Sequence, residues 1–155
     1  MLLATYILVV AILVAIDQYT KFMVVSHIAL YEKIEIIKGF FDLTYVRNYG
    51  AGFSIMQNET TFFIVITLIA IVLISYLLWH TNKNELLYRI SYLLILSGAI
   101  GNFIDRLKNV YVIDFLDFYI FGYDFPVFNV ADSFLTIGCF VLMGLALMEN
   151  RNAKS

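Results

Sequence analysis

Four long apolar runs constrain the fold of this chain more than any other feature of its sequence. They occupy about residues 2-25, 60-79, 86-104 and 128-148. A helix needs about 20 predominantly apolar residues to cross the hydrocarbon core of a bilayer, so each run is long enough to span it. Of the 155 residues, 62% are hydrophobic and only 14% are charged. We therefore predict an all-α integral membrane protein with four transmembrane helices, folded as one domain over residues 1-155.

The segments between the runs differ in character. Residues 28-57 contain short alternations rich in β-branched and aromatic residues, which predict a small β-sheet outside the membrane. The segment between the third and fourth runs is rich in Tyr and Phe, which indicates contact with the membrane interface. We therefore expect a single β-insertion, placed between the first and second spans.

Composition and motifs exclude several classes of function. The net charge of −2 leaves no basic excess, so no nucleic-acid partner is expected. Cys139 is the only cysteine, which excludes an intrachain disulfide and a cysteine-based zinc site. His27 and His80 lie near opposite ends of spans, so no metal site and no cofactor are expected. The sequence contains no HExxH, GxSxG or phosphate-binding loop motif.

The polar residues of the spans are predicted to gather at one membrane face. Because consecutive spans alternate in direction, the first and third end at the face where the second and fourth begin. The residues placed there are Asp17 and Lys21 in the first span, Arg47 and Asn48 before the second, Asn102, Asp105 and Arg106 around the end of the third, Asp114 in the next loop, and Asn129 and Asp132 in the fourth. A charge at mid-membrane costs roughly 2.5–3.5 kcal/mol. We therefore expect these groups to face one another or a wet cavity.

Several of these residues also have a purely structural interpretation. Asp17 and Lys21 are four residues apart, so they share a helix face and can form an ion pair. Asp105 can pair with its neighbour Arg106, and the asparagines can join helices through hydrogen bonds. The two glycines of SGAIGN permit close contact between helices.

Asp114 and Asp132 are candidates for a catalytic role. Asp132 lies one turn inside an apolar helix, and pairing with Arg106 across helices is the best structural explanation for it. Asp114 is flanked by apolar residues, although it can also be an ordinary loop acid. Two carboxyl groups in a poorly hydrated site cannot both ionise easily, so one keeps a proton while the other stays charged. Such a pair can hydrolyse a peptide by general acid/base catalysis.

Five short motifs carry a resemblance to a known family. DQYTK, RNYGAGFS, GNFIDR, VIDF and FNVAD occur in this order, and together they resemble the lipoprotein signal peptidase (type II signal peptidase) family. The resemblance implies a bacterial membrane aspartyl endopeptidase that cuts prolipoproteins just before a cysteine carrying diacylglycerol. It implies Asp114 and Asp132 as the catalytic pair. The residues that it implies bind substrate or support the site are Asp17, Lys21, Asn48, Asn102, Asp105, Arg106 and Asn129.

The same resemblance implies where the protein acts. It implies cytoplasmic termini and an active site near the outer face of the bacterial plasma membrane, with residues 28-57 as a cradle for the substrate. The positive-inside rule alone does not decide this orientation. The implied partners are a lipidated prolipoprotein and membrane lipid, and we expect a monomer. Gly52 departs from the family pattern, which has alanine there. The aromatic loop from Asp114 to Pro126 is a candidate lid over the site.

Two non-enzymatic hypotheses use the same residues. A small transporter or proton-conducting bundle would need polar residues along the whole path through the membrane, but the second span carries no charged residue. A scaffold would use the acids only to join helices, and it predicts that Asp114→Asn is tolerated.

Overall fold

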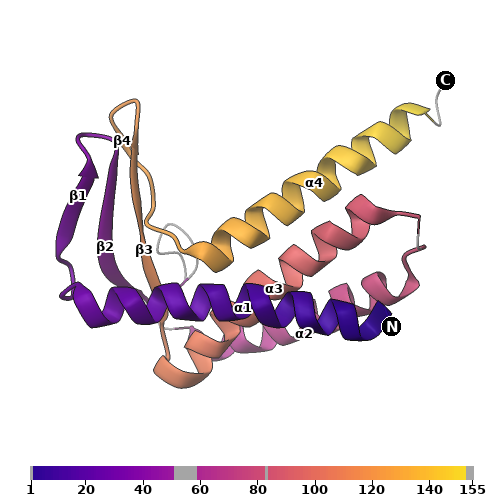
Figure 1. Ribbon diagram of the computed structural model, residues 1–155, viewed down its shortest axis with the longest axis horizontal. Helices are drawn as coiled ribbons and strands as arrows, with labels where there is room; N and C mark the ends of the chain where they lie inside the picture. Colours follow the sequence, from indigo (N-terminus) through magenta and orange to yellow (C-terminus); the bar gives the residue numbers. More distant parts are fainter. Residues whose placement is uncertain (1, 51–58, 83, 153–155) are drawn as a thin grey trace.

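The computed structural model describes residues 2–50, 59–82 and 84–152 (Figure 1). These residues form four helices and four strands. In chain order they are α1 (Leu2–His27), β1 (Lys33–Ile37), β2 (Phe41–Asn48), α2 (Thr60–His80), α3 (Leu86–Asn109), β3 (Val112–Ile120), β4 (Tyr123–Asp124) and α4 (Val130–Asn152).

All four helices are long and apolar enough to cross a membrane, which confirms the four predicted spans. Most apolar side chains of α2 are exposed, as expected for a helix surrounded by lipid. The third helix continues to Asn109 rather than ending near Ile104. Its last turn is polar, so the apolar run ends before the helix does. The helix ends at Val110, whose φ of 70° is left-handed and whose N–H donates to the carbonyl of Arg106.

The central helix is α3, which packs against α1, α2 and α4 (Figure 1). A methyl group on Gly98 would lie 2.3 Å from the carbonyl oxygen of Ala131, and one on Gly101 would lie 2.6 Å from Oδ2 of Asp17. Only glycine fits at these two positions, which confirms the predicted close contact between helices. The polar side chains of α1, α3 and α4 are therefore within hydrogen-bonding reach of one another.

The sheet is antiparallel, with strand order β1-β2-β3-β4. It stands at the end of the helices where α1 stops and α4 begins (Figure 1). The predicted insertion supplies β1 and β2, while residues 51–57 of that insertion lie outside the described residues. The prediction of a sheet is therefore confirmed, but its extent was wrong, because β3 and β4 come from the segment between the third and fourth spans.

The aromatic segment forms part of the sheet, which corrects its interpretation as a lid from Asp114 onwards. Strand β3 pairs with β2 from Phe41↔Phe118 to Asn48↔Val112, with a bulge between Leu43 and Val46. Such pairing fixes residues 112–120 in the sheet. The interpretation failed because the partner strand lies more than 60 residues away in sequence, and local patterns do not encode that pairing.

Several contacts join the sheet to the helices. Val24 of α1 and Ile28, which directly follows this helix, pack against Tyr45, Ile113 and Phe115 in a buried apolar cluster. The N–H of Ile113 in β3 also donates to Asp105 of α3. A further contact precedes α4, where the backbone of residue 128 pairs with that of residue 116 in β3. This pairing brings the start of α4 beside β3, and it sets the position of the polar residues described next.

Candidate active site

Asp114 is held on β3 by two asparagines. It lies opposite Val46 of β2, and Asn48 is two residues further along β2, so Asn48 and Asp114 share a face of the sheet. Asn48 Nδ2 donates to Asp114 Oδ2 at 2.9 Å, and Asn129 Nδ2 donates to Oδ1 at 2.6 Å. The Asp114 side chain is buried, with the residue only 2% exposed. Each carboxyl oxygen therefore has one amide donor.

Asp132 is held at the start of α4 by a reciprocal cap. Asn129 directly precedes the helix; its N–H donates to Asp132 Oδ2 at 3.2 Å, and the Asp132 N–H donates to Asn129 Oδ1 at 2.9 Å. This is a capping box with the acid three residues after the cap. From α3, Asn102 Nδ2 donates to Asp132 Oδ1 at 2.7 Å. The positive end of the α4 dipole also favours a negative charge at this position.

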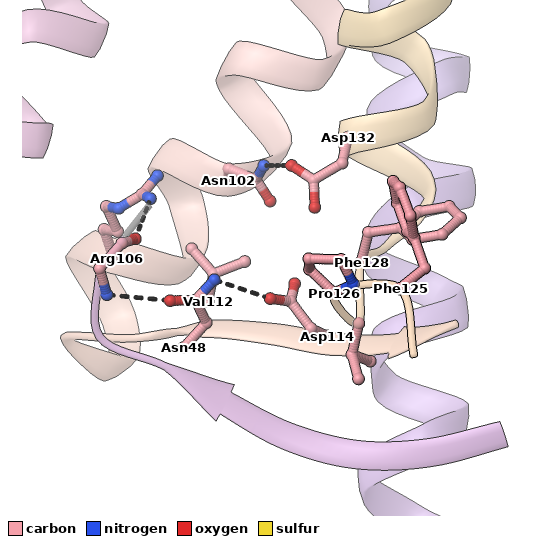
Figure 2. Close-up of a pocket in the computed structure, with 11 residues that line it drawn as sticks. Asn48, Asn102, Arg106, Val112, Asp114, Phe125, Pro126, Phe128 and Asp132 are labelled. Atoms are coloured by element: carbon pink, nitrogen blue, oxygen red, sulfur yellow. Dashed lines mark hydrogen bonds between the residues drawn. The ribbon is translucent and has the colours of Figure 1, made fainter. Parts of the chain in front are cut away.

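The two aspartates line one cavity of about 230 Å³ (Figure 2). In Figure 2 their carboxyl groups extend into it from β3 and from α4. The lining residues are Asn48, Gly50, Asn102, Arg106, Val112, Asp114, Phe125, Pro126, Val127, Phe128 and Asp132. Acidic and amide groups thus form one part of the wall, and apolar residues preceding α4 form another.

Burial raises the pKa of the Asp114 carboxyl to about 7, and the nearby negative charge of Asp132 acts in the same direction. The amide donors Asn48 and Asn129 and the charge of Lys21 act in the opposite direction, because they favour the ionised form. Near neutral pH, Asp114 therefore exchanges a proton readily, which suits a group that must give or take one during a reaction.

A second polar cluster lies behind the cavity. Lys21 Nζ is 2.9 Å from Asp17 Oδ2, 2.9 Å from Asp105 Oδ2 and 2.9 Å from Asn102 Oδ1. The ion pair between Asp17 and Lys21 confirms the structural interpretation of their spacing. Asp17 Oδ1 also accepts the N–H of Ala131, so the cluster connects α1, α3 and the first turn of α4.

The structure contradicts the expected pairing of Asp105 with Arg106. Asp105 pairs with Lys21 instead, because adjacent residues on a helix point in different directions. Within the described part of the chain, Arg106 forms no ion pair within 4.0 Å, either with Asp105 or with Asp132. Its guanidinium donates to the carbonyl of Gly50 at 3.1 Å and lies 5.0 Å from the ring of Phe63. Arg106 thus lines the cavity without an ion-pair partner among the described residues.

Of the nine residues proposed from the sequence, eight lie in the cavity wall or in the cluster behind it, and Asn129 bonds to Asp114, Asp132 and Asn102. Two contributions were missed. Gln18 donates to Asp105 at 2.9 Å and to the carbonyl of Gly101 at 3.2 Å; a glutamine inside an apolar span was the available signal. The apolar wall of residues 125–128 was missed as well, because its position depends on the pairing with β3. Gly52 lies outside the described residues.

The described residues contain no group of three or more His, Cys, Asp or Glu side chains placed to hold a metal ion. The donors and acids of the cavity are instead arranged for hydrogen bonding and proton transfer. Two carboxyl groups extend into it, one of them readily protonated, beside amide and guanidinium donors. Such an arrangement can activate a water molecule and stabilise a developing oxyanion.

Comparisons with known proteins agree over nearly the whole chain. The family model described as signal peptidase (SPase) II matches residues 9–148. The lipoprotein signal peptidase of Enterococcus faecalis (strain ATCC 700802 / V583) is 43% identical over 155 residues, which cover 99% of this chain and 94% of the relative. That of Streptococcus pyogenes serotype M1 is 50% identical over 141 residues, covering 89% and 90% of the two chains.

The fold is also similar to solved structures. Two structures, each described as a bacterial membrane enzyme, match with TM-scores of 0.89 and 0.83. The first is 38% identical in sequence, and the match covers 98% of this chain and 92% of the other chain. The second is 39% identical, with coverages of 93% and 92%.

Proposed function

Because the chain belongs to the signal peptidase II family, which includes the lipoprotein signal peptidases, we propose that it removes the signal peptide from lipid-modified prolipoproteins. The chain is a multi-pass membrane protein, with four helices apolar enough to span a bilayer. The proposed reaction is hydrolysis of the peptide bond before a cysteine that carries diacylglycerol, with Asp114 and Asp132 as the catalytic pair.

One observation carries the assignment of the pair. Asp114 and Asp132 reach the same buried cavity from different elements, and each is held by amide donors rather than by an ion pair of its own. An acid that served only to join helices would be expected to pair with a cation. Arg106, the cation lining this cavity, donates to a backbone carbonyl instead.

The reaction needs one charged and one protonated carboxyl group. In our proposal Asp132 is the base, because the helix dipole, the capping N–H and Asn102 all favour its charged form. It takes a proton from water, and the water oxygen attacks the peptide carbonyl. Asp114, whose pKa is raised to about 7, holds the other proton and gives it to the carbonyl oxygen. When the tetrahedral intermediate collapses and the C–N bond breaks, Asp132 gives the proton taken from water to the leaving amine, and a hydroxyl group of the intermediate returns its proton to Asp114.

The amide and guanidinium groups around the pair position the substrate in this proposal. Asn48 and Arg106 line the cavity beside the acids and carry N–H donors for peptide carbonyls. Apolar side chains of the substrate can pack against the apolar wall of residues 125–128.

In this proposal the cavity, which is lined by residues of β2 and β3, lies at the sheet end of the helices (Figure 1). We place this end at the outer face of the bacterial plasma membrane, with both termini in the cytoplasm, and we expect a monomer. A substrate cysteine with two acyl chains would remain anchored in the outer leaflet. The scissile bond would then meet the acids near the interface, without extraction of the lipid.

A cleavage assay in detergent tests this proposal. Purified protein is given a diacylglyceryl-modified prolipoprotein and its unlipidated twin. We expect cleavage of the lipidated protein only, and a loss of roughly 10²–10⁴-fold or more in Asp114→Asn and in Asp132→Asn. Thermal unfolding of both variants shows whether they fold. Cleavage at the wild-type rate in either folded variant would refute the catalytic pair.

A further inference from the structure

Lys21 is a buried cation that does not line the cavity. Its residue is 1% exposed, and it is separated from Asp132 by the side chain of Asn102. All three of its N–H donors have acceptors: Asp17, Asp105 and Asn102. The two ion pairs reach the backbone beside the catalytic pair, because Asp17 accepts the N–H of Ala131 and Asp105 accepts the N–H of Ile113. Only the third contact, with Asn102, leads to a side chain that bonds to a catalytic carboxyl group.

The amide of Asn102 is held in one orientation by its neighbours. Its Oδ1 accepts from Lys21 Nζ at 2.9 Å and from Asn129 Nδ2 at 3.1 Å, and its Nδ2 donates to Asp132 Oδ1 at 2.7 Å. A reversed amide would turn its NH₂ group towards a lysine that can only donate. It would also turn its oxygen towards a carboxylate. Lys21 therefore disfavours the reversed orientation strongly.

We propose that Lys21 is a positioning residue that holds the Asn102 N–H on Asp132 and thereby keeps Asp132 as the charged base of the pair. The proposal rests on the function given above and extends it to a residue that touches neither substrate nor the reacting atoms. Asn129 holds the same oxygen of Asn102, so the loss of Lys21 weakens this arrangement without abolishing it.

Several charged groups other than Lys21 also surround Asp132. Asp114 faces it from β3 and Arg106 from α3, while Asp17 and Lys21 act on it from α1. Lys21 is thus one of two cations acting on the pair, and it is the one bonded to an amide that contacts Asp132. Besides this direct electrostatic effect, Lys21 is linked to Asp132 by a chain of two hydrogen bonds, Lys21 to Asn102 and Asn102 to Asp132.

The test compares two variants of the full-length protein in detergent. Lys21→Met alone leaves Asp17 and Asp105 without their cation, so it can fail to fold. The double variant Lys21→Met with Asp105→Asn keeps the net charge of this cluster at −1, because it removes one charge of each sign. Asp105→Asn alone retains the bond from Lys21 to Asn102 and isolates the contribution of the lysine.

We expect the double variant to lose about tenfold or more in kcat relative to Asp105→Asn, with KM within about twofold, because a charge-assisted hydrogen bond contributes on this order. The acidic limb of kcat/KM against pH should move to higher pH. Lys33→Met is the matched control: it breaks an ion pair of 2.7 Å with Asp117 that has no link to Asn102, and kcat should not change. Equal kcat in the double variant and Asp105→Asn would overturn the proposal.

A second readout needs no activity. The side-chain NH₂ resonances of Asn102, assigned by their loss in Asn102→Ser, should exchange faster with water in the double variant than in Asp105→Asn. Unchanged exchange would overturn the role of Lys21 even in a fully active enzyme. If the wild type cleaves no prolipoprotein, the proposed function fails, and the exchange measurement still decides whether Lys21 orients Asn102.

Discussion

Asp132 has a structural role as a helix cap and a proposed catalytic role, and the structure explains why one does not exclude the other. Its carboxylate closes a capping box with Asn129 at the start of α4. The same carboxylate extends into the cavity that Asp114 reaches from β3. A cap alone would account for an acid at this position, since acids are favoured in the first helical turn. A cap needs neither the hydrogen bond from Asn102 nor the opposing carboxyl group of Asp114, so these two features favour a catalytic role.

The protonation of Asp114 should be visible in the pH dependence of stability. Its pKa is about 7 in the folded protein, against an ordinary value of 3.8. Between these values the folded state binds more protons than the unfolded state, so stability falls as pH rises from about 4 to about 7 and then levels off. The loss amounts to at most roughly 4 kcal/mol, at about 1.4 kcal/mol per pKa unit.

We therefore expect Asp114→Asn to flatten this dependence, because asparagine does not titrate. Thermal unfolding in detergent from pH 4 to pH 8 measures it, with Asp124→Asn, an exposed acid of the β-hairpin, as the control. The same slope in Asp114→Asn and in the wild type would contradict a raised pKa at this residue.

Helix α3 determines how closely the polar residues approach. Gly98 and Gly101 sit against α4 and α1, and neither position has room for a methyl group. Ser97, also in this helix, is fully buried, and its hydroxyl donates to the carbonyl of Leu93. It therefore needs no hydrogen-bond partner on a neighbouring helix. The close approach of three helices is therefore a property of small side chains along α3, and the catalytic geometry depends on it.

The substitution Gly98→Ala should separate α3 from α4. The added carbon would lie 2.3 Å from a backbone oxygen, which cannot rotate away as a side chain can. We expect a loss of roughly 1–3 kcal/mol in stability, typical of overpacking, and reduced cleavage. Gly144→Ala is the matched control in α4, because nothing lies within 4 Å of the added carbon. It should be neutral or stabilising by about 1 kcal/mol. Equal unfolding temperatures for the two variants would contradict this account.

The elements differ in how far the sequence predicts them. The spans were predictable because apolar length is a local property. The strand β3 was not, since its apolar and aromatic residues also suit a membrane interface and its partner β2 is distant in sequence. Among the site residues, the i,i+4 pair Asp17 and Lys21 was predictable from spacing. The partner of Asp105 was not, because it comes from another helix.

The polar residues of the helices are concentrated at one end of the molecule. The sheet lies at the end of the molecule where α1 and α3 end, while the link between α2 and α3 lies at the other end (Figure 1). The cavity and the charged cluster contain residues near the sheet end. A path for ions would need polar groups at both ends and between them. The apolar groove among α1, α2 and α3 is lined instead by residues such as Leu78, Leu93 and Leu96. This distribution favours a surface-facing hydrolase over a conducting bundle.

The proposed orientation predicts which end is accessible from outside. In a Cys139→Ser background, a cysteine at Tyr123, in the exposed β-hairpin, should react with a membrane-impermeant maleimide on intact protoplasts. A cysteine at Asn84, in the link between α2 and α3, should react only after lysis. Both variants should retain cleavage, since neither residue lines the cavity. The reverse labelling pattern would place the active site in the cytoplasm.

The order of the catalytic groups along the chain has a consequence for biosynthesis. Asp114 precedes α4, whereas Asn129, which bonds to both halves of the pair, and Asp132 arrive with it. A nascent chain that has inserted α1, α2 and α3 therefore carries a strand with one acid and no counterpart. If Asp114 and Asp132 are the catalytic pair, as we propose, proteolytic activity can begin only after the last helix has entered the bilayer, so a partly synthesised chain cannot cleave other polypeptides at the site of insertion.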